Sequence, residues 1–137
     1  MIPAPPDAVW AVLTDFDSYS EWNPLNVEAR GKAAAGARIP MTFVNPARAG
    51  AKVKLPVRLT HVEPGRRLEW IGEIPVLFRG RHFFDLSPDG GGTRMVHGED
   101  MSGMISWGIS ARQIEQDFIP VYQAMNAALA ARAARRT

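Results

Sequence analysis

The chain has 137 residues, of which 46% are hydrophobic and 22% charged, which is typical of a folded domain with a buried core. It has no cysteine, and this excludes disulfides, thiolate nucleophiles and zinc–thiolate sites. The formal net charge of +2 does not indicate nucleic acid as a partner, and no apolar run is long enough to span a membrane. Because the start shows no signal-peptide pattern, we expect one cytoplasmic domain over residues 1–137.

The N-terminal segment predicts a cap of two short helices. Pro6 suits the first turn of a helix, where a missing N–H group costs little. Apolar residues then recur at helical spacing, at Val9, Trp10 and Leu13. Residues 14–17 break this helix, and residues 19–22 predict a single further turn. Pro24 ends it, because the residue before a proline is pushed away from helical geometry.

Six strand candidates follow, recognised by alternating apolar residues and by the turn residues between them. They cover residues 27–30, 38–44, 53–59, 68–73, 77–86 and 93–101. Pro56 lies inside the third candidate and predicts a sheet edge or a bulge there. The sequence SPDGGG at residues 87–92 predicts a turn that pairs Leu86 with Thr93.

The C-terminal region predicts one long helix. Its apolar stripe has spacings of three and four residues and consists of Ile114, Phe118, Tyr122, Met125 and Leu129. Pro120 falls inside this stripe and predicts a kink or a broken turn. The order of elements is typical of an α+β fold, in which the long helix covers one face of an antiparallel sheet and leaves a hollow.

Five segments carry a family resemblance: IPAPPDAVWAVLTDFDSYSEWNP, VEPGRRLEW, GRHFFDLSP, GGTRMVHGEDMSG and MNAALAARA. In this order they resemble the START-like helix-grip superfamily (SRPBCC), in its polyketide cyclase/dehydrase branch. The resemblance implies a helix-grip fold, with a curved antiparallel sheet of about six or seven strands wrapped around the long C-terminal helix. It implies a cavity that binds a small hydrophobic molecule. We expect no cofactor. The resemblance also implies a strand before the proline-rich segment, where only Met1 and Ile2 stand. Because unpaired sheet edges are rarely tolerated, we expect a homodimer that fills the gap or a visibly open edge.

The predicted hairpin brings several polar residues to one face. If Leu86 pairs with Thr93, Phe84 lies opposite Met95 and His82 lies opposite His97. The more apolar face, which should look inward, then holds His82, Phe84, Leu86, Thr93, Met95, His97 and Glu99. Arg81, Asp85 and Asp100 should look outward.

We identify His82, His97 and Glu99 as candidate catalytic acid/base groups, because imidazole titrates near neutral pH. The alternative is a polar cavity lining whose groups are satisfied by neighbours or water. A metal site is the weakest interpretation, because the histidines lack a metal-binding spacing, and we expect no metal. The candidate ligand contacts are Trp70, Phe84, Met95, Met101, Trp107, Phe118, Tyr122 and Met125.

Trp107 lies in a glycine-bounded loop and is the candidate for the cavity mouth. Core packing is the alternative for Trp107 and for each of the other candidate contacts. Three functions stay open. The first is binding of an aromatic, polyketide-like or lipid ligand, the second is a cyclase or dehydratase-like activity, and the third is a chaperone-type or assembly role.

Overall fold

The computed structural model describes residues 1–48 and 50–136, so that Ala49 and Thr137 of the predicted domain lie outside the described residues. The helical segments are α1 (Pro6–Thr14), η1 (Phe16–Glu21), η2 (Met104–Gly108), α2 (Ala111–Gln113), η3 (Ile114–Phe118) and α3 (Ile119–Ala134). The strands are β1 (Asn26–Ala29), β2 (Arg38–Ile39), β3 (Met41–Val44), β4 (Lys52–Lys54), β5 (Val57–Glu63), β6 (Arg67–Ile74), β7 (Phe78–Asp89) and β8 (Gly92–Ser102). This is the expected α+β helix-grip arrangement.

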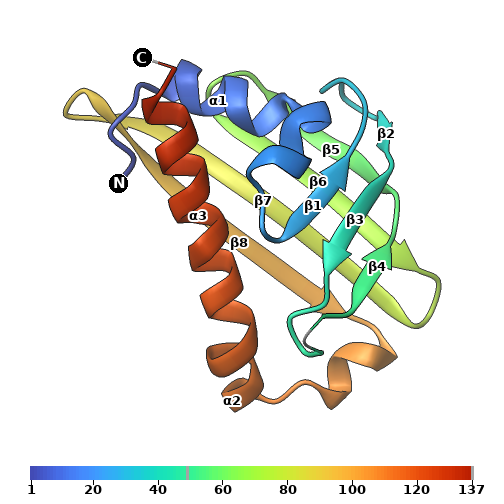
Figure 1. The fold of residues 1–137 in the computed structure, drawn as a ribbon. Coiled ribbons are helices and arrows are strands. Elements are labelled where there is room, and N and C mark those ends of the chain that lie inside the picture. The colour runs from blue at the N-terminus through green and yellow to red at the C-terminus, as the bar shows by residue number, and fades with distance from the viewer. Residues whose placement is uncertain (49, 137) are drawn as a thin grey trace.

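The strands form two antiparallel sheets. One has the order β2-β5-β6-β7-β8 and the other the order β1-β3-β4. Helix α3 lies along one face of the larger sheet, and α1 and η1 lie together near one end of α3 (Figure 1). The hydrophobic core lies between these layers, where Leu13 of α1, Phe16 of η1 and Trp70 of β6 meet Met125 and Leu129 of α3.

Two prolines explain why six predicted strands become eight. Pro40 divides the second candidate into β2, which pairs with β5, and β3, which pairs with β1 and β4. Pro56 likewise separates β4 from β5 and so passes the chain from one sheet to the other. Proline cannot donate to a ladder, so each break falls where a strand changes partners. The sequence predicts a sheet edge or a bulge at Pro56, and the structure places this residue between β4, an edge strand of the smaller sheet, and β5.

The predicted register of the β7–β8 hairpin is wrong by two positions. Leu86 pairs with Met95 rather than Thr93, Phe84 with His97 and His82 with Glu99. The strands continue to a two-residue turn at Gly90 and Gly91, whose φ angles are 57° and 87°. Two glycines with positive φ suit such a tight turn, which twists with the strands. Because the error is an even number, each residue keeps its predicted face.

The long helix is interrupted as predicted. Residues 114–118 form a π-helical turn, η3, immediately before α3. Pro120 follows in the first turn of α3, where it has no N–H group to donate back along the helix. The apolar stripe survives the interruption at Phe118, Met125 and Leu129, which are buried.

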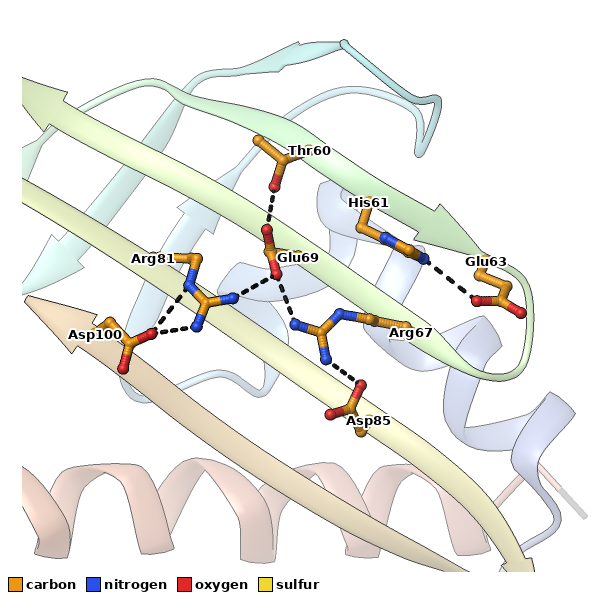
Figure 2. Close-up of polar contacts among 8 residues, drawn as sticks. All are labelled: Thr60, His61, Glu63, Arg67, Glu69, Arg81, Asp85 and Asp100. Carbon is orange, nitrogen blue, oxygen red and sulfur yellow. Dashed lines mark hydrogen bonds and ion pairs between the residues drawn. The ribbon is translucent and has the colours of Figure 1, made fainter.

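The outer face of the larger sheet carries a charged network (Figure 2). The carboxylate of Glu69 accepts hydrogen bonds from Arg67 at 2.7 Å and from Arg81 at 3.0 Å. Arg67 also donates to Asp85 and Arg81 to Asp100, so these charges point outward as predicted. The guanidinium groups of both arginines lie over the ring of Phe83, 4.9 and 5.2 Å from its centroid. The opposite face of the same strands is therefore left for the apolar interior.

The place of the expected first strand is nearly empty among the described residues. Ile2 makes two backbone hydrogen bonds with Thr93, at 2.8 and 2.9 Å, and forms an isolated bridge. One edge of β8 pairs with β7 along its whole length. On the other edge, the bridge to Ile2 is the one strand pairing found among the described residues. Beyond Thr93, this edge of β8 has no strand partner among the described residues.

Candidate functional site

A cavity of about 300 Å³ lies between the sheets and the C-terminal helical region. Its walls come from β3 and the loop after it, from β4 to β8, from η2 and from the start of the long helix. Most of the lining is apolar: Leu25, Phe43, Val44, Pro46, Ala47, Val53, Leu55, Val57, Trp70, Gly72, Ile74, Phe78, Gly80, Met101, Ile105, Ile109 and Phe118. Four polar residues complete it: Asn45, His82, Glu99 and Tyr122.

Three of these polar residues form one corner of the cavity. His82 and Glu99 are opposite each other on β7 and β8, with His82 Nδ1 3.5 Å from Glu99 Oε1. The hydroxyl of Tyr122, on α3, donates to Glu99 Oε2. Gly80 makes room for the carboxyl, because a Cβ at this position would lie 3.1 Å from Glu99 Oε1. The side chains of His82 and Glu99 are only 5% and 10% exposed.

Burial holds this corner in its neutral form. It raises the pKa of Glu99 to about 8, with a smaller contribution from the charge of Asp100. Burial also lowers the pKa of His82 well below its usual range, and the nearby His97 adds to this effect. The His82–Glu99 separation is short enough for an ion pair, yet both shifts favour a protonated carboxyl beside a neutral imidazole at pH 7. We therefore interpret the contact as one between neutral groups.

His97 lies behind this corner rather than in the cavity wall. Its Nδ1 is 2.8 Å from Asn126 Oδ1, and an amide oxygen can only accept, so Nδ1–H donates this hydrogen bond. Its ring stacks on Phe84 with centroids 4.4 Å apart and lies 5.2 Å from the ring of His82. Burial lowers the pKa of His97, and the hydrogen bond to Asn126 opposes that shift. The arrangement makes His97 a support for His82.

The structure separates the predicted site residues into two groups. Six of them line the cavity: His82, Glu99, Trp70, Met101, Phe118 and Tyr122. Five lie outside its lining: His97, Phe84, Met95, Trp107 and Met125. Phe84 and Met125 are core residues, and Met95 packs partly buried against that core. Trp107 is 81% exposed on η2, beside the cavity mouth rather than inside it.

Sequence reasoning missed much of the cavity lining, including the wall from β3, and one supporting residue. Phe43, Val44 and Asn45 line the cavity from the end of β3, where the sequence predicted only a strand running into a loop. The sequence signal that could have indicated this wall is the apolar pair Phe43-Val44 directly before Asn45-Pro46. Asn126 was also missed, although it lies four residues after Tyr122 and therefore on the same helix face.

Two further features concern the described residues, 1–48 and 50–136. Over these residues, no three side chains of histidine, aspartate or glutamate gather closely enough to hold a metal ion. In the same ranges, no helix combines the length and the apolar character that crossing a membrane requires.

Comparison with known sequences gives one family match. Residues 1–134 match the model of a family described as polyketide cyclase/dehydrase and lipid transport. No curated protein sequence matches the chain.

Solved structures with the same fold include several bacterial proteins, three of which are compared below. A Rhodobacter sphaeroides protein is 18% identical with a TM-score of 0.77, over 100% of this chain and 90% of that one. A Thermus thermophilus protein is 19% identical with a TM-score of 0.75, over 99% and 94%. The Zhui aromatase/cyclase of Streptomyces sp. R1128 is 17% identical with a TM-score of 0.72, over 98% and 90%. At such identities, these likenesses establish the fold alone.

Proposed function

This chain belongs to the polyketide cyclase/dehydrase and lipid transport family, and on that premise we propose that it binds a small hydrophobic molecule in its cavity. The observation that carries the proposal is a mostly apolar cavity whose polar lining residues, apart from Asn45, gather in one corner at His82, Glu99 and Tyr122. Such a lining gives affinity through its apolar area and orientation through a few polar groups. The volume of about 300 Å³ is at the small end for ligand sites, which favours a compact aromatic or polyketide-like molecule over a long-chain lipid.

The polar corner favours an uncharged ligand. The carboxyl of Glu99 is mostly protonated at pH 7 because burial raises its pKa to about 8. A charged ligand would lose its hydration without meeting an opposite charge there. A carbonyl or hydroxyl group can instead exchange hydrogen bonds with Glu99 and Tyr122.

Native mass spectrometry of the protein purified from its own host tests this proposal. We expect a co-purifying uncharged molecule, and the neutral fluorophore N-phenyl-1-naphthylamine should compete with it. The variant Met101→Trp fills the cavity and should abolish probe binding. Val96→Trp is the matched control, because Val96 is on the same strand but faces outward. Probe binding that survives Met101→Trp unchanged would overturn the cavity as the site.

An enzymatic role is the second candidate, and one observation favours it. A carboxyl with a raised pKa and an imidazole with a lowered pKa lie 3.5 Å apart at the cavity wall. Opposed shifts of this kind are typical of acid/base pairs. His82 would take a proton from the carbon next to a substrate carbonyl. Glu99 would donate a hydrogen bond to the carbonyl oxygen, where negative charge develops.

Two alanine variants separate carrier from enzyme once a ligand is known. For an enzyme, His82→Ala should remove turnover and leave binding intact, and His97→Ala should reduce turnover less because His97 acts through His82. For a carrier, both variants should change binding alone. The open cavity supports these two functions over the third, a chaperone-type role acting through the surface.

We also propose that a second copy of the chain pairs with the open edge of β8, forming a homodimer. Support comes from the row of backbone groups beyond Thr93 for which the described residues provide no strand partner. Light scattering coupled to size-exclusion chromatography should give twice the chain mass. A monomer at all concentrations would overturn this proposal.

A further inference from the structure

A second hollow, of about 420 Å³, lies on the outer face of the smaller sheet and has the size of a small-molecule site. Strand alternation separates it from the cavity. Phe43 and Val53 pair on the inner face and line the cavity, whereas Thr42 and Lys54 pair on the outer face and line the hollow. The two sets of lining residues share no member. The function proposed for the cavity therefore makes no use of this outer hollow.

Basic side chains predominate in the lining of the outer hollow. Three positive charges, on Arg30, Arg38 and Lys54, stand against one negative charge, on Glu28, so the lining has a net charge of +2. Within residues 1–48 and 50–136, the side chains of these three cations take part in no ion pair. Figure 2 shows the opposite case on the larger sheet, where both arginines of the outer network meet carboxylates. The positive charge of the hollow is therefore left without a partner among the described residues.

One of these cations also faces a like charge. Arg38 of β2 lies directly opposite Arg58 of β5 in the antiparallel pair, and both side chains are exposed. Their neighbours Ile39 and Val57 are buried, so the two arginines point outward together. Like charges directly opposite each other destabilise a sheet. An anion bound beside Arg38 would relieve this repulsion.

A buried hydroxyl group forms the floor of the outer hollow. Thr42 is only 9% exposed, and the strand register places it between Glu28 of β1 and Lys54 of β4 in one cross-strand row. The described residues give its hydroxyl no hydrogen-bond partner. Buried polar groups usually have such a partner, and a hydroxyl can donate to a ligand oxygen. The floor of the hollow therefore provides a donor beneath the basic side chains.

We infer that the outer hollow binds a soluble phosphate monoester by its phosphate group. Such a phosphate is close to dianionic at pH 7, so its charge balances the +2 of the lining. Guanidinium groups bind phosphate oxygens through paired N–H donors, and the hydroxyl of Thr42 can donate to a further oxygen. Glu28 can accept from a hydroxyl group of the ester's organic part. None of the exposed large apolar side chains of the described residues lines the hollow, so a free ester fits it better than a lipid bilayer.

Titration of the full chain with β-glycerophosphate, followed by heteronuclear NMR, tests the inference. We expect the backbone amide signals of Arg38, Thr42 and Lys54 to shift, and that of Met101 in the cavity to stay in place. Lys54→Gln should weaken binding about tenfold, because it removes a hydrogen bond between charged groups. Thr42→Val should weaken binding about threefold, because it keeps the shape of the side chain and removes the hydroxyl.

Two controls make the test specific. Lys52→Gln removes an equal charge from the same face of β4, outside the lining of the hollow, and should leave binding unchanged. Vesicles that contain phosphatidic acid present the same phosphate chemistry on a lipid headgroup. The inference is overturned if millimolar β-glycerophosphate shifts none of the signals of the hollow, or if Lys52→Gln weakens binding as much as Lys54→Gln. A protein that binds these vesicles but not the soluble ester would also overturn it.

Discussion

Glu99 is a single residue whose burial opposes stability at high pH. Its pKa is about 8 in the folded protein, against 4.5 for an ordinary glutamate. Between these two values the unfolded chain has released the proton and the folded chain still holds it. The free energy of unfolding therefore falls as the pH rises from about 4.5 to about 8. His82 and His97 act at the other end, because their lowered pKa values destabilise the fold as the pH falls below 6.5.

Glu99→Gln should remove the loss of stability at high pH. Glutamine does not titrate, and its side-chain oxygen still accepts the hydrogen bond from Tyr122. Relative to the wild type, the variant should gain on the order of 3 kcal/mol of unfolding free energy between pH 5 and pH 8.5. Urea denaturation at the two pH values measures this difference, and the histidine contributions cancel because both proteins share them. Stability differences that are equal at both pH values would contradict the prediction.

Val76, in the β6–β7 turn, allows a second test on a single residue. Here the unfavourable energy comes from the backbone conformation rather than from a buried side chain. Val76→Asn should raise the free energy of unfolding by about 1 kcal/mol, since asparagine tolerates a φ of 68° better than valine does. Urea denaturation checks the gain. Val96→Asn is the control in extended strand geometry, where no such gain is expected. If Val76→Asn is no more stable than the wild type, the turn is not strained in solution.

At the scale of elements, the outer network of the larger sheet links β5, β6, β7 and β8. Glu69 stands at its centre and accepts from Thr60 at 2.9 Å as well as from Arg67 and Arg81. Burial alone would raise its pKa, but the hydrogen bonds from Arg67 and Thr60 and the charge of Arg81 outweigh burial, so that the pKa is lowered. This contribution to stability is present above pH 4.5 and is lost as the pH falls below that value.

Glu69→Gln should therefore destabilise the fold at pH 7 by about 1 kcal/mol, because two charge-assisted hydrogen bonds are weakened together. Chemical denaturation measures the change. Glu63→Gln is the matched control, since Glu63 pairs with His61 and Arg66 in a more exposed position and should cost less than about 0.5 kcal/mol. Equal effects of the two substitutions would mean that the network adds nothing beyond ordinary surface pairs.

The sequence allowed the elements to be predicted better than the connections between them. The existence of the two-helix cap, the long helix and its interruption before Pro120 followed from local signals of helix spacing and proline. The bounds of η1 did not, because it begins at Phe16, inside the predicted break at residues 14–17, and ends at Glu21. The register at Leu86 did not, because SPDGGG is compatible with a loose six-residue turn and with a tight turn at two glycines. Only the pairing of whole strands decides between these turns. The faces survived this error because strand alternation has a period of two.

The sequence predicted which side chains of the candidate site face inward, because this depends on strand alternation. It did not predict which of those side chains reach the cavity. His82 and Glu99 share a face with Phe84 and His97, and alternation alone cannot show which of them reach the cavity. The position of α3 decides this, since Asn126 engages His97 and Tyr122 engages Glu99. Such contacts between distant elements leave no local signal in the sequence.

At the scale of the molecule, we expect the predicted single domain to unfold as one cooperative unit. Leu129 of α3 and Leu13 of α1 are both fully buried in the same core. Leu129→Ala and Leu13→Ala should each lower the free energy of unfolding by about 2–4 kcal/mol, with an unchanged dependence on urea concentration. Tryptophan fluorescence and far-ultraviolet circular dichroism should report the same midpoint. Separate midpoints would show that α3 melts independently of the sheet.

The packing of α3 against α1 affects how the chain folds during synthesis. These two helices come from opposite ends of the sequence, and ion pairs from Arg132 to Glu21 and from Arg136 to Asp15 join the same two regions. During synthesis, the strands leave the ribosome before the helix that covers them. Until α3 packs, Trp70 and Phe84 stay exposed to solvent. Contacts between residues so distant in sequence also form slowly. The time at which α3 emerges therefore decides how long the nascent chain exposes its core to aggregation.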